Sequence, residues 1–213
     1  MTSADALPQA DELAEIEKDI RDFFVSEALA TDTGAVDVRP PMEVAVCAST
    51  ELAQAASLRS SVRFIARFHH QILRSGTPAG YAWTQRRDGK LVIVEMNYSR
   101  LRAEAIDRGV IAMAQDPKAG PLVLLEVPDR QLVGVWSKES AAVMVVHAPE
   151  HPSVCWRSIT EEAFTGVFRE TPAPMRLTDH CVRGYSESLR GPREPLPAKP
   201  FARQLDRQME LRP

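Results

Sequence analysis

The sequence predicts an α+β fold: a largely antiparallel sheet built from hairpins, with helices packed on one face. Two hairpin signals support this prediction. Asp88-Gly89 separates the strand-like runs Tyr81–Arg87 and Lys90–Met96, and a two-residue Asp-Gly loop favours a type I′ turn. A second hairpin is expected around Pro128-Asp129-Arg130, because proline suits the second position of a type I turn. Hydrophobic residues make up 44% of the chain, which is enough to bury a core.

The chain begins with an acidic segment that has helical periodicity. Within Ala10–Leu29, apolar residues recur at spacings of three and four, which is typical of an amphipathic helix (Leu13, Ile16, Ile20 and Phe23). Such a stripe packs either on its own domain or on another copy of the chain. We expect three regions: residues 1–41 as this N-terminal helix and its linker, residues 42–182 as the α+β core, and residues 183–213 as an extended Pro-rich tail.

The next elements lead to the most distinctive stretch of the chain. Met42–Ala48 is rich in valine and is predicted as a buried strand, after which Ser49 or Thr50 can cap a helix. Leu58–Arg74 is then predicted as a long two-faced helix that ends at Gly76.

The Asp-Gly hairpin follows, with Arg87 expected opposite Lys90 and Trp83 opposite Val94. Further elements are a helix with Leu101, Ile106, Val110 and Met113 facing inward, four strands, and a last helix with Phe164 and Phe168 buried. The expected ranges are Ser99–Gln115 for the first helix, and Leu122–Val127, Leu132–Trp136, Ala141–His147 and Ser153–Ile159 for the strands.

Composition favours a cytoplasmic protein. The first residues are acidic and lack the basic start and apolar run of a signal peptide, and no apolar run approaches the ~18 residues of a membrane span. Three cysteines suit a reducing compartment better than a disulfide framework. Frequent Ala, Arg and Pro with few Asn and Lys indicate a GC-rich bacterial source. No cofactor motif is present, so no cofactor is expected.

Charge is divided unevenly along the chain. Residues 1–58 contain three basic and twelve acidic side chains, whereas residues 59–102 contain nine basic and two acidic ones. On a helix spanning Leu58–Arg74, four arginines and one histidine would lie within about 80° of arc: Arg59, Arg63, Arg67, His70 and Arg74. The adjacent hairpin tip would add more basic side chains, with Trp83 close by. The expected binding residues are Arg59, Arg63, Arg67, His70, Arg74, Arg86, Arg87, Lys90 and Trp83.

This basic region predicts a non-enzymatic binding or accessory protein that contacts an acidic partner. Arginine binds phosphate and carboxylate through its planar fork, so both nucleic acid and an acidic protein surface fit. A third reading is internal: the acidic N-terminal helix covers the arginines. Oligomerisation through the N-terminal helix or the C-terminal tail is a further expectation. No membrane contact is expected.

A rival reading is a small enzyme or metal-binding protein. His147-Ala-Pro-Glu150-His151 matches the H-x-x-E-H string, but Pro149 argues against the helix that this motif needs. A looser cluster would use imidazole and thiolate ligands, which zinc favours, or a thiol nucleophile near a histidine. Its residues are His147, His151, Cys155, His180 and Cys181. No residue is predicted as catalytic or as a metal ligand on this evidence.

Overall fold

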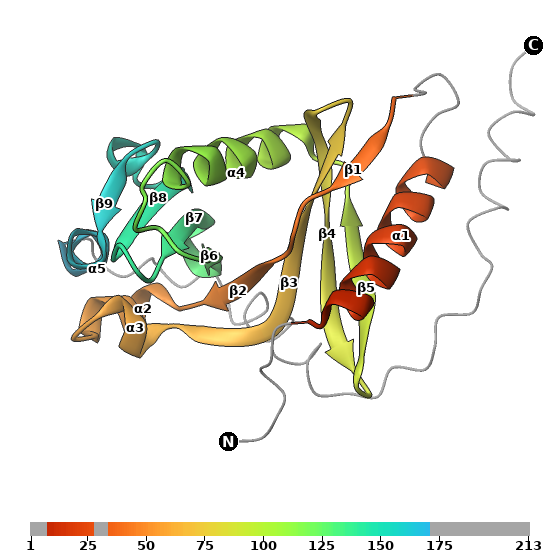
Figure 1. The fold of residues 1–213 in the computed structure, drawn as a ribbon. Helices are drawn as coiled ribbons and strands as arrows, with labels where there is room; N and C mark the ends of the chain where they lie inside the picture. Colours follow the sequence, from red (N-terminus) through yellow and green to blue (C-terminus); the bar gives the residue numbers. More distant parts are fainter. Residues whose placement is uncertain (1–7, 28–33, 171–213) are drawn as a thin grey trace, which may run out of the picture. The chain divides into compact units, whose positions relative to one another are not determined.

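A nine-stranded sheet forms the centre of the computed structural model, which describes residues 8–27 and 34–170 (Figure 1). These residues lie in the first of two units of the chain, residues 1–174 and 175–213. The strand order is β5-β4-β3-β2-β6-β7-β8-β9, and β1 pairs with β3. The strands are β1 Val36–Val38, β2 Met42–Val46, β3 Arg63–Arg74, β4 Thr77–Arg87, β5 Lys90–Asn97, β6 Leu122–Val127, β7 Leu132–Ser137, β8 Ala142–His147 and β9 Ser158–Thr160.

One parallel pairing joins two antiparallel halves of this sheet. β2 runs parallel to β6, with Val44 opposite Leu124, whereas the other neighbouring strands are antiparallel. A tight turn cannot join parallel neighbours such as β2 and β6, so the chain must cross over the sheet before it enters β6. The crossover contains one long helix between β5 and β6. The helices are α1 Ala10–Glu27, α2 Ser49–Gln54, α3 Leu58–Ser61, α4 Arg100–Met113 and α5 Glu161–Glu170. None of the helices in the described ranges is long and apolar enough to cross a membrane.

Helices cover both faces of the sheet, not one as expected. On one face, Ile106 and Met113 of α4 pack against residues that include Trp83 of β4 and Leu124 of β6. On the other face, α1 packs on the β3–β5 half, and α2 and α5 pack on the β6–β8 half. Figure 1 shows α4 (green) and α1 (red) on different parts of the sheet. The α+β class, the largely antiparallel sheet and the N-terminal helix are confirmed.

The N-terminal helix packs on its own domain. Ile16, Ile20 and Phe24 of α1 are buried against Val38 and Ile72, so two of the four residues of the predicted stripe, Ile16 and Ile20, are buried inside the chain. Phe23, which the pattern placed inward, is exposed. In this arrangement the buried residues of α1 face the sheet of their own chain. The predicted Pro-rich tail lies outside the described residues.

The long helix predicted over Leu58–Arg74 is wrong. Only Leu58–Ser61 is helical (α3), capped by the Ser57 hydroxyl, which accepts a hydrogen bond from the Ser60 amide. Residues 63–74 form strand β3, which continues into β4 through a tight turn. Ser75 and Gly76 have φ of 48° and 78°, values that match a type I′ hairpin turn as well as a helix end.

The two predicted hairpins are confirmed, with one change of register. Arg87 lies opposite Lys90 as expected, but Trp83 pairs with Glu95, not Val94, because the register shifts between Trp83 and Thr84. Leu101, predicted inward, is exposed. The strand predicted over Ser153–Ile159 is mostly replaced by a short 3₁₀ turn and the three-residue β9.

Gly109 lets α4 approach the sheet closely, and this gives a test of the fold. A Cβ atom at Gly109 would lie 2.4 Å from Val146 Cγ1 and 3.1 Å from Val135 Cγ2. We expect Gly109→Ala to lower the free energy of unfolding by about 1–2 kcal/mol, because overpacking outweighs the better helix propensity of alanine. Denaturant unfolding measures this change.

Gly166→Ala in α5 is the matched control. A Cβ there meets nothing within 4 Å, so this variant should be more stable than wild type by up to about 1 kcal/mol. If Gly109→Ala and Gly166→Ala change the free energy of unfolding in the same direction, the result would contradict the close packing of α4 against the sheet.

Candidate functional site

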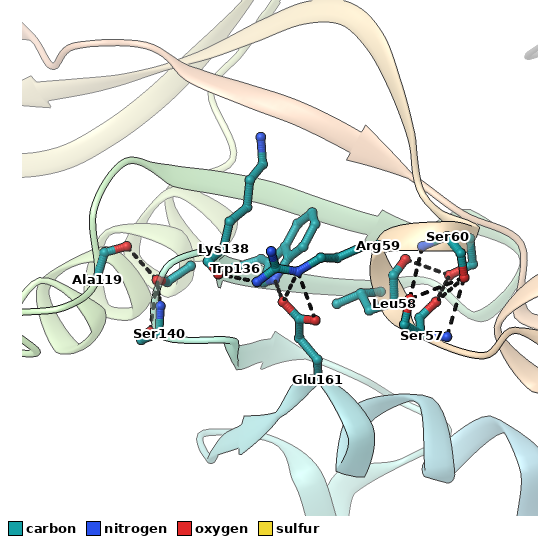
Figure 2. A network of polar contacts seen from close by, with 11 residues as sticks. Ser57, Leu58, Arg59, Ser60, Ala119, Trp136, Lys138, Ser140 and Glu161 are labelled. Atoms are coloured by element: carbon teal, nitrogen blue, oxygen red, sulfur yellow. Dashed lines mark hydrogen bonds and ion pairs between the residues drawn. The ribbon is translucent and has the colours of Figure 1, made fainter.

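The predicted basic face is divided by strand β3, because successive side chains on a strand point to opposite sides. Arg59 lies before the strand, in α3, where its side chain is exposed but paired with other residues of the chain. Its Nε lies 3.2 Å from Glu161 Oε1, and its guanidinium also donates to the Lys138 carbonyl (Figure 2). Trp136 Nε1 donates to the same Glu161 oxygen at 2.9 Å. Arg59 therefore ties α3 to β7 and α5.

Two other predicted cations are covered by the acidic N-terminal helix. Arg86 Nη1 donates to Glu12 Oε1 at 2.6 Å, and Arg74 lies over the Phe24 ring at 5.2 Å. The hydrogen bond from Arg86, with a second from the Gln9 amide, lowers the pKa of Glu12 to about 2. Arg74 and Arg86 therefore contact α1, which is the arrangement that the internal reading of the basic region expects.

The remaining predicted residues lie in different surroundings. Arg63 is exposed and pairs with Glu51 at 2.9 Å, while Arg87 and Lys90 are exposed at the hairpin tip. His70 is fully buried, its Nε2 lies 2.9 Å from Thr84 Oγ1, and burial lowers its pKa to about 4. His70 is therefore a neutral core residue and cannot contact a partner.

Arg67 and Trp83 are two predicted binding residues that the structure brings into contact across β3 and β4. The Arg67 guanidinium lies 5.5 Å from the centre of the Trp83 ring. Two residues along β4, the Tyr81 ring carries a second guanidinium, that of Arg102 from α4, at 5.6 Å. Arg102 forms an ion pair with Glu126 at the end of β6. We call this group the Arg67–Glu126 cluster; its members are Arg67, His69, Tyr81, Trp83, Glu95, Arg102 and Glu126.

Glu126 is the electrostatic centre of the cluster. Desolvation by burial raises its pKa, and Glu95 adds to this effect, although the positive charges of Arg102 and Arg67 act in the opposite direction. A buried carboxyl with a raised pKa beside named charge partners marks a candidate functional site. The Arg102 side chain is 37% exposed and Glu95 is exposed, so the cluster reaches the surface.

His69 and Trp83 contribute buried polar atoms that have no hydrogen-bond partner. Burial lowers the pKa of His69 to about 3, so the ring is neutral. Gln71 donates its amide to the Ala103 carbonyl at 3.0 Å, which leaves Gln71 Oε1 to accept from His69 Nε2 at 3.3 Å. His69 Nδ1 is then an acceptor, and Trp83 Nε1 is a donor; both atoms are buried and unbonded. Buried polar atoms of this kind call for an explanation such as a ligand or water.

The predicted His/Cys cluster is not assembled among the described residues. His147 is exposed, whereas the buried His151 ring stacks edge-on to Phe168 at 5.7 Å. In residues 8–27 and 34–170, no group of three or more His, Cys, Asp or Glu side chains could hold a metal ion. Cys47 is a core residue, since burial raises its pKa to about 12. His180 and Cys181 lie outside the described residues.

Sequence reasoning missed Arg102 and Glu126. Arg102 was counted only as part of the basic segment, and Glu126 lies in the apolar run Leu122–Val127. A single carboxylate inside such a run is itself a signal, because a charged group in a buried strand needs a partner.

Comparison with known proteins does not assign the chain to a family. No family model matches it, and neither the curated proteins nor the solved structures that were searched contain a match. The cluster itself is therefore the basis for any functional argument.

The raised pKa of Glu126 predicts how stability changes with pH. Between the usual glutamate pKa and the higher folded value, the folded state binds more protons, so Glu126 lowers stability as pH rises through this window. In Glu126→Gln this loss is absent. We therefore expect the stability of Glu126→Gln relative to wild type to increase as pH rises from about 4 to 8.

Urea unfolding across this pH range measures the difference. The control is Glu95→Gln, which changes an exposed member of the same cluster and should give a smaller slope. A relative stability of Glu126→Gln that stays constant or falls with rising pH would show that Glu126 is not destabilised by burial.

Proposed function

We propose that the protein is a non-enzymatic binding protein that takes an acidic segment of a partner protein at the Arg67–Glu126 cluster. One observation carries the proposal: two guanidinium groups from different elements lie over aromatic rings of one strand, and the positive charges of both act on a single buried carboxylate, which Arg102 pairs directly. Stacking limits the freedom of both side chains before a ligand arrives. A pre-ordered arginine loses less entropy on binding, and its planar fork fits a carboxylate.

The orphaned donors of the cluster support an acceptor-rich ligand. Trp83 Nε1 and Arg102 Nε are both buried and lack an acceptor. A carboxylate has two oxygens and only accepts hydrogen bonds, so it can satisfy donors of this kind. The partial exposure of Arg102 gives such a group a route to the cluster.

The distribution of charge favours an acidic protein segment over nucleic acid. A nucleic-acid strand requires an extended series of basic contacts to its phosphates. Here several exposed arginines are already paired within the chain: Arg59 with Glu161, Arg63 with Glu51, and Arg100 with Glu104. The hairpin carrying Arg86 is bound to α1, whose outer face exposes Asp11, Glu15, Asp19 and Asp22. These carboxylates interrupt an extended basic surface at the hairpin, which a long polyphosphate needs and a short acidic segment bound at the cluster does not.

Removing both arginines of the cluster should weaken binding of the acidic segment. We expect Arg67→Gln/Arg102→Gln to weaken the affinity for a short polyglutamate peptide by at least about tenfold, which corresponds to 1.4 kcal/mol. Arg63→Gln/Arg87→Gln removes the same net charge outside the cluster and should bind nearly as well as wild type. Calorimetric titration with the peptide and with a single-stranded oligonucleotide of equal charge gives the affinities.

Three results would contradict the proposal. An equal loss in both double variants would indicate a general charge effect, and tighter binding of the oligonucleotide would indicate nucleic acid. If the wild type does not bind the peptide, the proposed function is wrong.

Glu126 competes with the partner for the two arginines, and this predicts the effect of its neutralisation. Glu126→Gln should bind the peptide more tightly than wild type at pH 7. The difference should shrink as pH falls from about 7 through the raised pKa of Glu126, because protonation of Glu126 in the wild type then releases the same arginines. Titrations of both proteins across this range test the idea, and a gap that does not depend on pH would argue against competition by Glu126.

A further inference from the structure

The outward face of α4 exposes apolar residues at regular spacing. Leu101 is 82% exposed and Ile111 48% exposed, and between them on the same face lie Glu104 and Arg108. These four residues are separated by three, four and three positions, so they occupy about 80° of arc on the helix. This is the 3-4 spacing of a helix that packs against another helix.

The fold of this chain does not require that face to be apolar. α4 is anchored by its opposite side, where Ala103, Ile106 and Met113 are buried against the sheet. An isolated exposed leucine is ordinary, but a stripe with two apolar ends and charged residues between them has the composition of an interface.

Trp156 extends the apolar surface beside α4. Its ring is 44% exposed, and the Arg108 guanidinium covers it at 4.5 Å. The backbone of Trp156 has φ of 60°, which is unusual for a bulky L residue and costs energy. The fold therefore holds a large aromatic ring at the surface, next to the Arg108 side of the stripe.

The stripe is complementary to a second copy of itself that runs in the opposite direction, because it has an apolar residue at each end and two opposite charges between them. If two copies of α4 pack antiparallel through this outward face, with the two-fold axis at the level of residue 106 along the helix, Leu101 of one copy meets Ile111 of the other. In the same register Glu104 meets Arg108. A two-fold axis generates each pair twice, which gives two apolar contacts and two pairs of opposite charge.

We propose that the outward face of α4 is a self-association surface, on which a second copy of this chain docks antiparallel. Charge complementarity selects this occupant, because the single register that pairs the apolar ends also pairs Glu104 with Arg108. A helix of this length spans about 21 Å, so the interface is small and the dimer is of the weak, reversible class.

Reversing one charge at a time tests the register. Glu104→Arg places two arginines opposite each other, and Arg108→Glu places two glutamates opposite each other. Sedimentation velocity at protein concentrations up to about 100 μM should show a dimer for wild type, and dimerisation at least about tenfold weaker for each variant. An equimolar mixture of the two variants should form a heterodimer, since each arginine then meets a glutamate.

Two controls separate self-association from folding and from the contact within the helix. Glu104 also pairs with Arg100 of its own helix at 2.7 Å; Arg100→Glu/Glu104→Arg restores this internal pair but should still dimerise poorly. Leu101→Ser should weaken the dimer without changing the melting temperature measured at concentrations where the protein is monomeric, because the side chain is exposed in the single chain. A monomeric wild type, unchanged dimerisation in both charge variants, or no heterodimer in their mixture would each overturn the proposal.

Discussion

The parallel pairing of β2 with β6 is the constraint on which the rest of the structure depends. It joins two antiparallel halves that would otherwise each have an open edge. Because β6 must run in the direction of β2, the chain crosses the sheet as α4 before entering it. From the first turn of α4, Arg102 reaches Glu126 near the end of β6. The Cys47 amide donates to the Glu126 carbonyl at 3.1 Å, so the backbone of Glu126 is fixed by the same pairing.

Because helices cover both faces of the sheet, the central side chains of β3 are buried, and this limits which of them can carry a charge. Residues Phe68–Leu73 are all buried, with α1 on one side and α4 on the other. Polar residues in this stretch must be neutral or bonded, and burial lowers the pKa values of His69 and His70 to about 3 and 4. The arginines of β3 accordingly lie outside this buried stretch, over an aromatic ring or paired with a carboxylate. The basic residues of this segment therefore lie on either side of a buried stretch of strand and do not form one continuous face.

Local signals could be read from the sequence, whereas long-range pairings could not. Asp88-Gly89 gave the hairpin and its Arg87–Lys90 pair, because the turn sets the register over the first residues. Ser75-Gly76 has the same positive φ values but was interpreted as a helix end. Strand and helix periods both fit Leu58–Arg74, since burial on two faces removes the alternation that distinguishes a strand. Arg102 and Glu126 are 24 residues apart and meet only because β6 joins β2.

A single helix links the two surfaces proposed for this protein. Consecutive residues on a helix point about 100° apart, so Leu101 and Arg102 project from one turn of α4 in different directions. Their directions are set by how α4 packs: Gly109 permits close approach to Val146, and Asp107 pairs with Arg39 at 3.0 Å. A rotation of α4 that withdrew Arg102 from Glu126 would also turn Leu101 out of its antiparallel register. The same packing against the sheet therefore fixes both the geometry of the Arg67–Glu126 cluster and the stripe on the outward face.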